Sequence, residues 1–320
     1  MSNPNSNTHI SVLINEVNDF LLAQKKTQLI DQQVNLFDGT LGGGGYTQYF
    51  IDYSHDNKIR LNQYSSDLDQ GAIDRVLSYI KCPDDINLEL RNGNFAEVIT
   101  TFENSFFDGI VVDLGFSSNQ LEIDKRGFSY QQGGQELDLR YSIDVTHSCS
   151  YKLLRLHDWQ QLGKILYNYS GEDLAAKIAK AIYNSNKKTA WTVQEMVDIV
   201  ISVIPAVALK RKNQILSRVW QALRIWTNDE FASLESFIIC AKDKLKIGGR
   251  LVVVSFHSLE DKIVTNYFRQ LSKAVTEDIY GNKQYDFKII NARPIVPSIK
   301  EIEANPRSRS AVMRVLERLR

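Results

Sequence analysis

Residues Asn35 to Thr47 read Asn-Leu-Phe-Asp-Gly-Thr-Leu-Gly-Gly-Gly-Gly-Tyr-Thr, and this segment decides the fold of the chain. A short apolar run ends in an acid, four glycines follow, and a polar stretch that can begin a helix comes next. This order predicts a strand, a tight turn and the N-terminus of a helix. A glycine-rich loop taken alone is also compatible with a simple surface turn. A strand that runs into such a loop is nevertheless typical of a nucleotide-like cofactor site in an open α/β sheet, because glycines let a ligand approach the main chain.

Two acids that flank the loop favour a cofactor site. Asp38 stands directly before Gly39, and Asp67 closes the next predicted strand, Arg60–Ser66, 22 residues after Gly45. That spacing is close to the offset of about 20 residues at which an acid binds ribose hydroxyls. No Lys-Ser or Lys-Thr pair follows the glycines, which disfavours a phosphate-binding P-loop. An acid beside the loop would repel phosphate but suits a cationic cofactor such as S-adenosylmethionine (SAM), which carries a sulfonium and an ammonium group.

The composition limits the classes of protein. With 320 residues, 43% of them hydrophobic, the chain suits one large domain or a domain with an insertion. Its formal net charge is +0, so binding to nucleic acid must come from local basic patches. Three widely spaced cysteines, Cys82, Cys149 and Cys240, show no metal-ligand spacing and predict no metal and a reducing, cytoplasmic location. The polar N-terminus and the lack of an apolar run of about 18 residues predict neither a signal peptide nor a membrane span.

A third acid ends the strand whose burial is most clearly predicted. Residues 108–115, Asp-Gly-Ile-Val-Val-Asp-Leu-Gly, are almost continuously apolar around Asp113, which is typical of a central parallel strand. Ligands of open α/β sheets bind beyond the carboxyl ends of the strands, so we expect Asp38, Asp67 and Asp113 on one edge. The other elements predicted for this part are helices over 12–22 and 69–79 and a strand over 87–91.

The pattern changes between Phe116 and about Leu216, where no strand-like run occurs. Three segments have helical periodicity: Asp158–Tyr169, Glu172–Ser185 and Thr192–Ile204. The last opens with the capping box of Thr192 and Glu195. We therefore predict an inserted helical domain at residues 117–216, within an α/β domain built from residues 1–116 and 217–320.

The α/β pattern resumes after the insertion. A long helix is predicted over Ser217–Leu245, ending at Gly248–Gly249, followed by a buried strand, Arg250–Ser255, just before His257. The elements predicted last are a helix over 259–271 and strands over 286–291 and 311–318. A terminal strand pair after five alternating units predicts the seven-stranded, mostly parallel sheet of SAM-dependent methyltransferases, and it differs there from dinucleotide-binding folds.

Several motifs span nearly the whole chain. They are His9-x-x-Val12-Leu13, Asp38-Gly39-Thr40, Asp113-Leu114-Gly115-x-Ser117-Ser118-x-Gln120-Leu121, Arg126-Gly127-Phe128-Ser129, Leu137-Asp138-x-Arg140, Gln221-Ala222-Leu223-Arg224-Ile225, Gly248-Gly249-Arg250-Leu251, Ser255-Phe256-His257-Ser258-Leu259-Glu260-Asp261 and Asn305-Pro306-Arg307-Ser308-Arg309-Ser310. By these motifs the chain resembles the bacterial 16S rRNA (cytosine-N4)-methyltransferases, the RsmH or MraW family.

The resemblance implies a class I SAM-methyltransferase domain, Rossmann-like, with a helical insertion that recognises the substrate. It implies SAM as methyl donor and methylation of the N4 amine of a cytosine in the decoding region of 16S rRNA, in the small ribosomal subunit. The cofactor-binding residues expected from the loop and the motif match are Asp38, Gly42, Gly44, Gly45, Tyr46, Asp67 (at the ribose), Phe95 (at the adenine), Asp113 and Gln120. A homodimer is left open by the sequence.

The chain departs from the family pattern at three positions. The family usually has histidine after the glycines, where this chain has Tyr46, and commonly has proline where Asn119 and Glu136 stand. Tyrosine keeps a polar ring tip but cannot become cationic near neutral pH. These changes bear on SAM affinity and on the rigidity of the substrate loop.

Methyl transfer to an amine needs alignment and a proton acceptor. Cytosine N4 is a poor nucleophile, and an acceptor for its N–H would help it to react. Asp113 is the first candidate, with binding of SAM as an equally weighted role; the Ser117 hydroxyl and nearby carbonyls are alternatives. His257 could contact the base or orient Asp113, and a purely structural role has equal weight. Methylation at cytosine C5 would need a cysteine nucleophile, and no cysteine is predicted at the end of a strand.

RNA recognition would use aromatic and basic side chains. Phe116, Phe128 and Tyr130 are candidates for stacking on bases, although core packing is the commoner role of such residues. The basic clusters are Lys187–Lys188, Lys210–Arg211–Lys212, Arg218 with Arg224, and Arg307 with Arg309. The neutral total charge predicts modest affinity for naked RNA and favours a folded ribosomal particle as substrate.

Two other functions are weighed. A nicotinamide oxidoreductase would use the same glycine loop, but Asp38 and the terminal strand pair argue against it. A SAM- or RNA-binding protein without turnover is motivated only by Tyr46 and Asn119.

Overall fold

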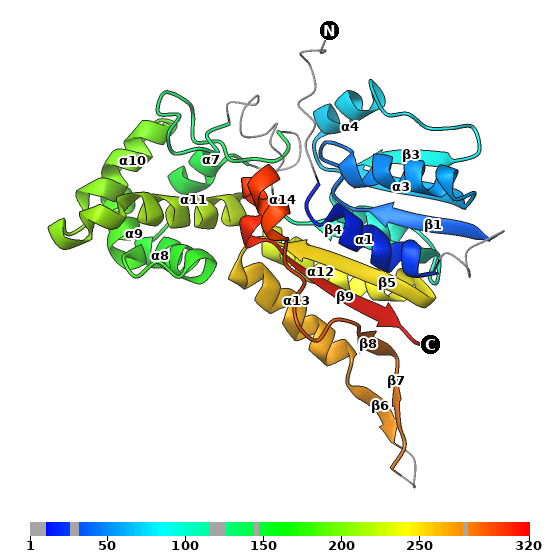
Figure 1. Ribbon diagram of the computed structural model, residues 1–320. Helices are drawn as coiled ribbons and strands as arrows, with labels where there is room; N and C mark the ends of the chain where they lie inside the picture. Colours follow the sequence, from blue (N-terminus) through cyan, green and yellow to red (C-terminus); the bar gives the residue numbers. More distant parts are fainter. Residues whose placement is uncertain (1–10, 26–31, 116–125, 144–146, 278–280) are drawn as a thin grey trace. The chain divides into compact units, whose positions relative to one another are not determined.

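The computed structural model describes residues 11–25, 32–115, 126–143, 147–277 and 281–320 (Figure 1). It divides into two compact units: a sheet unit of residues 1–115 and 231–320, and a helical unit of residues 116–230. The insertion expected from the sequence ends at residue 216, whereas the helical unit also holds α11 (Lys212–Asn228), which packs on α8 (Trp159–Ser170).

A seven-stranded sheet forms the sheet unit, in the order β3-β2-β1-β4-β5-β9-β8. Its strands are β1 (Gln33–Asp38), β2 (Arg60–Asp67), β3 (Asn87–Asn92), β4 (Phe107–Asp113), β5 (Leu245–Ser255), β8 (Phe287–Ile289) and β9 (Val312–Arg318). The first five are parallel, while β9 runs antiparallel to both β5 and β8. The predicted seven-stranded, mostly parallel sheet with a terminal antiparallel pair is confirmed.

Helices cover both faces of this sheet (Figure 1). The covering helices are α1 (Ile14–Leu21), α3 (Gly45–Asp56) and α4 (Gln70–Leu77) on one side, and α12 (Glu230–Lys244) and α13 (Ser258–Leu271) on the other. Neighbouring residues of β4 face opposite ways: Val111 packs with α1 and α3, whereas Ile110 and Val112 pack with α12 and α13. Burial on both faces explains the apolar run Ile110–Val112 of β4 and the run Leu251–Val254 of β5.

The predicted helix over 217–245 is wrong in its extent. Two helices occupy this region, because Asp229 adopts a left-handed conformation (φ 50) and ends α11. Gly248 and Gly249 do not stop a helix but lie inside β5, where the register against β4 shifts. A Cβ at Gly249 would come within 2.9 Å of the Phe107 carbonyl oxygen, so the close strand approach at this irregularity requires glycine.

The remaining elements are short. In the sheet unit they are η1 (Ala23–Lys25), α5 (Phe95–Val98), η2 (Ile99–Thr101), the hairpin β6 (Ala274–Glu277) and β7 (Lys283–Tyr285), α14 (Ile299–Ala304) and η4 (Pro306–Ser310). The hairpin was not predicted, because its exposed residues lack apolar alternation. Across the described parts of both units, no helix combines the length and apolar character needed to cross a membrane.

The helical unit has a core of its own. Its helices are α7 (Cys149–Leu154), α8, α9 (Ala175–Asn184), α10 (Val193–Ser202), η3 (Ala206–Arg211) and α11. The predicted capping box is present: the Thr192 hydroxyl accepts from the Glu195 N–H, and the Glu195 carboxylate accepts from the Thr192 N–H. The apolar stripe of α10 packs against α8, α9 and α11.

Candidate active site

Three acids end three adjacent parallel strands of the sheet unit. Asp38 closes β1, Asp67 closes β2 on one side of it, and Asp113 closes β4 on the other. The structure therefore brings these three predicted residues together on one edge. Ligands of open α/β sheets bind beyond this edge.

Asp38 is wholly buried, with 0% of its surface exposed. Burial raises the pKa of its carboxyl to about 6, hydrogen bonds from Thr40 and Thr47 lower it, and the charge of Asp67 raises it. Thr40 N donates to Oδ1 at 3.1 Å, and the Thr47 hydroxyl donates to Oδ2 at 2.9 Å. Asp38 thus ties the first turn of the glycine loop to the first turn of α3.

The glycine loop is held by backbone contacts to the neighbouring strands. Gly39 N donates to the Val111 carbonyl, and Gly44 caps α3 in a left-handed conformation (φ 69). A Cβ at Gly39 would lie 2.7 Å from Val112 Cγ1 and 3.1 Å from Phe95 Cβ, so no larger residue fits there without displacing its neighbours.

Asp67 anchors the far side of the loop. Gly42 N donates to its Oδ2 at 2.7 Å, and Asp69 N donates to its Oδ1 at 2.9 Å. Burial raises the pKa of Asp67 to about 6, against these two hydrogen bonds, which lower it. Each oxygen keeps a further lone pair, as an acid that accepts ribose hydroxyls requires.

Asp113 is the least satisfied acid of the three. Its backbone N donates to the Thr40 hydroxyl at 2.7 Å, but its buried Oδ1 has no hydrogen-bond partner among the described residues. Burial raises its pKa well above the usual range, and the charges of Asp38 and Glu260 raise it further. An uncompensated buried acid beside a second one fits a ligand that brings positive charge or an N–H donor.

The two predicted aromatic residues of the cofactor site differ in placement. Phe95 begins α5 at the sheet edge, half-buried, with its ring edge-on to Phe237 at 5.0 Å. Tyr46 is only 3% exposed, and its hydroxyl donates to the Val12 carbonyl in the core beneath α3. The ring tip of Tyr46 is therefore engaged by the protein itself.

His257 caps a helix. It precedes α13, and its Nδ1 accepts from the Glu260 N–H at 3.3 Å. The Glu260 carboxylate accepts in turn from the Phe256 and His257 N–H groups and lies 3.0 Å from His257 Nε2. These contacts give His257 the structural role that the sequence left open, and they leave its catalytic role a prediction.

Two predicted site residues, Ser117 and Gln120, and the stacking candidate Phe116 lie outside the described residues. The remaining glycine, Gly45, opens α3 beside Tyr46. Of the other stacking candidates, Phe128 is buried against Tyr141, and Tyr130 packs edge-on to Trp220, so both belong to the core of the helical unit.

Sequence reasoning missed the hydroxyls that support the acids. Thr40 and Thr47 both donate to Asp38, the Thr40 hydroxyl accepts from Asp113 N, and Ser65 and Gln63 stand behind Thr47. A signal existed for the last two, because alternate residues of β2 face the core and two of those positions are polar.

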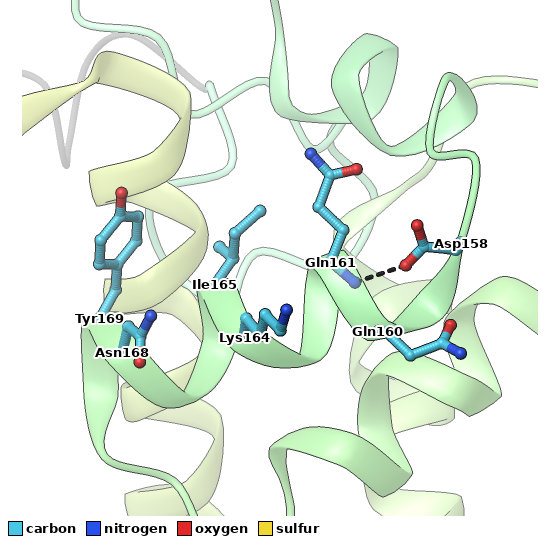
Figure 2. A pocket seen from close by; sticks show the side chains of 7 residues that line it. All are labelled: Asp158, Gln160, Gln161, Lys164, Ile165, Asn168 and Tyr169. Carbon is cyan, nitrogen blue, oxygen red and sulfur yellow. Dashed lines mark hydrogen bonds between the residues drawn. The ribbon is translucent and has the colours of Figure 1, made fainter.

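An open depression of about 500 Å³ lies along α8 of the helical unit (Figure 2). Its lining consists of Asp158, Gln160, Gln161, Lys164, Ile165, Asn168 and Tyr169. Its one carboxylate, Asp158, is used as a helix cap and accepts from Gln161 N at 2.6 Å. The lining offers amides and one amine, and we assign it no catalytic chemistry. Within the described residues, no group of three or more His, Cys, Asp or Glu is arranged to hold a metal ion.

Comparison with known proteins places these features in a family. The profile of the MraW methylase family matches residues 6–319. The protein named Ribosomal RNA small subunit methyltransferase H of Wolbachia sp. subsp. Drosophila simulans (strain wRi) is 34% identical over 322 residues, covering 98% of this chain and 99% of its own. Proteins of the same name from Limosilactobacillus fermentum (34% over 322 residues) and Carboxydothermus hydrogenoformans (32% over 321 residues) each match 98% of both chains. The chain belongs to the MraW methylase family.

Proposed function

We propose that this chain transfers a methyl group from SAM to the N4 amine of a cytosine in small-subunit (16S) rRNA. The observation that carries the proposal is the buried Asp113 Oδ1 at the sheet edge, which has no hydrogen-bond partner among the residues that the structure describes, in a chain from the MraW methylase family. Relatives that match almost the whole chain are named Ribosomal RNA small subunit methyltransferase H. The choice of N4 comes from the motif resemblance.

The residues present fit SAM. SAM would supply a methyl group on a cationic sulfur; in the reaction the N–C bond forms as the S–C bond breaks. Asp38 and Asp113 provide negative charge where a cation would bind, and Asp67 offers acceptors for a ribose. Asp113 Oδ1 can accept an N–H, either from the SAM ammonium or from cytosine N4, and in the second case it takes the proton that N4 loses. A raised pKa suits a carboxylate for that task.

The cysteines support methylation at nitrogen over methylation at C5. Cys149 lies in the core of the helical unit, where burial raises its pKa to about 12. Cys82 precedes β3 and Cys240 lies within α12, so neither ends a strand at the acid edge. A thiol nucleophile for C5 would have to be low in pKa and at the site.

The helical unit is the proposed substrate-recognition part. The connection between α10 and α11 and the first residue of α11 expose Lys210, Arg211 and Lys212, which we call the basic tip, and Val207 in the same connection is 92% exposed. The sequence has no acid between Asp198 and Asp229. Cations at the start of a helix are unfavourable to its dipole, so helix stability does not explain the tip, whereas contact with RNA phosphates does.

Labelled SAM and small ribosomal subunits from cells that lack this protein provide the test. After incubation the rRNA is digested and its nucleosides are identified. We expect N4-methylcytidine at one site, and no label with Asp113→Ala. Label in another nucleoside, or none while SAM still binds, would contradict the proposal. Binding and single-turnover rates of Asp113→Asn separate the two roles: SAM binding falls if Asp113 holds the cofactor, and the rate alone falls if it accepts the N4 proton. A homodimer and a cytoplasmic location stay predictions.

A further inference from the structure

A series of hydrogen-bonded, buried polar side chains, which we call the hydrogen-bond series, runs under α3 to Asp38. Gln63 Nε2 donates to Ser65 Oγ at 3.0 Å, and Ser65 Oγ lies 2.7 Å from Thr47 Oγ1. Thr47 Oγ1 then donates to Asp38 Oδ2 at 2.9 Å. All four side chains belong to residues with at most 1% exposure.

The chemistry of these groups decides which group donates in each bond of the hydrogen-bond series. Thr47 has a single hydroxyl proton and donates it to Asp38, so the proton between Ser65 and Thr47 comes from Ser65, which accepts in turn from the Gln63 amide nitrogen. Every proton thus points toward the carboxylate. Hydrogen bonds in series strengthen one another, and a hydrogen-bond series whose donors all point toward Asp38 favours the ionised form of this acid.

The surroundings of Asp38 oppose ionisation. It is enclosed by the sheet and α3, and the titratable groups that face it are Asp67 from β2, Asp113 from β4 and Tyr46 from α3. None of them can bring a positive charge. Among the described residues, the groups that offset the cost of burying this charge are therefore the Thr47 hydroxyl with Ser65 and Gln63 behind it, and the N–H and side chain of Thr40.

We propose that Thr47 and Ser65 act as positioning residues that keep Asp38 ionised, so that the glycine loop retains a negative charge for the sulfonium of SAM. This inference rests on the proposed function for its ligand. Asp38 is set apart from the other acids by its place: it is fully buried, and it holds both Thr40 and Thr47.

The first measurement is made without SAM. Aspartate carboxyl carbons of the full-length protein are labelled with ¹³C and titrated by NMR, and the Asp38 signal is identified by its loss in Asp38→Asn. Thr47→Val keeps the shape of the side chain and removes the donor. We expect it to raise the Asp38 midpoint by about one to two pH units, from about 6 in the wild type. Ser65→Ala should produce a smaller rise, and Thr47→Ser should restore the wild-type midpoint.

The second measurement compares SAM with S-adenosylhomocysteine, which lacks the sulfonium charge. At pH 7.5, a midpoint raised by up to two units leaves about a quarter of Asp38 ionised, so Thr47→Val should lower the affinity for SAM by up to about fourfold and change the affinity for S-adenosylhomocysteine far less. At pH 8.5 or above, where Asp38 is ionised again, most of the SAM affinity should return.

Two results would overturn the inference. One is an unchanged Asp38 midpoint in Thr47→Val. The other is an equal loss of affinity for both ligands at every pH, which a merely structural role predicts. A wild type that binds no SAM at any pH would instead refute the proposed function. The carboxyl titration would still decide whether Thr47 and Ser65 control the ionisation of Asp38.

Discussion

Replacing Tyr46 with phenylalanine removes a single buried hydroxyl from the sheet unit. That hydroxyl donates to the Val12 carbonyl, and the ring stacks on Phe50 at a centroid distance of 6.2 Å. Burial holds the pKa of Tyr46 well above its usual value, so the group is a donor at every working pH. Phenylalanine keeps the ring packing and leaves the Val12 carbonyl without this donor. We expect a loss of about 1–3 kcal/mol in the free energy of unfolding.

The same helix supplies a matched control. Tyr49 also lies on α3 and also donates to the N-terminal segment, at 3.0 Å from Asn15 Oδ1, but this bond is exposed. Water replaces an exposed partner, so Tyr49→Phe should change the unfolding free energy by less than about 0.5 kcal/mol. The two variants lose the same atom and differ in the burial of the bond it made.

The assay uses the distribution of tryptophan. All four tryptophans, Trp159, Trp191, Trp220 and Trp226, lie in the helical unit, so their fluorescence follows that unit while circular dichroism follows both. In urea, Tyr46→Phe should lower the midpoint of the dichroism transition at unchanged slope. A fluorescence midpoint that moves less would assign the loss to the sheet unit. Equal effects of Tyr46→Phe and Tyr49→Phe would refute the reasoning.

Three further predictions concern Gly39, the basic tip and Asp38. Gly39→Ala should lower the free energy of unfolding by about 1–3 kcal/mol and weaken SAM binding, because its Cβ would lie 2.7 Å from Val112 Cγ1. Gly134→Ala is the control, since a Cβ there would have no atom within 4 Å, and it should change neither quantity. Urea unfolding measures the first quantity and calorimetry measures the second. Neutralising the basic tip to glutamine should reduce the slope of log affinity for small subunits against log salt by about 2, and an unchanged slope would exclude the tip from phosphate contact. Burial raises the pKa of Asp38 to about 6 in the folded protein, so the stability that this carboxyl contributes is present below about pH 4 and is lost as the pH rises to about 6. The free energy of unfolding of Asp38→Asn should therefore rise relative to that of the wild type between about pH 4 and pH 6. A difference between the two that stays constant over this range in urea unfolding would contradict the prediction.

The sheet could be predicted because its central strands have recognisable sequence patterns. Burial on both faces makes β4 an almost continuous apolar run and gives β1 the pair Leu36–Phe37, and each strand ends in an acid. The glycine pair at 248–249 misled the prediction, since glycine ends a helix and also permits a bulge, and only contact with β4 decides between them. That contact joins residues far apart in the sequence.

Tyr46 shows why the site itself was harder to predict. A residue in the first turn of a helix after a glycine loop can point at a ligand or into the core, and its sequence neighbourhood is the same in both cases. Here the side chain points into the core, where the Tyr46 hydroxyl donates a hydrogen bond to the carbonyl of Val12, 34 residues upstream. Where the family usually carries histidine, this chain thus has a ring long enough to reach that carbonyl and uncharged at neutral pH. Burial raises the pKa of Tyr46, and nearby acids, Asp113 and Asp38 first among them, raise it further, so the ring stays neutral and does not compensate the charge of these acids, which is left for a ligand.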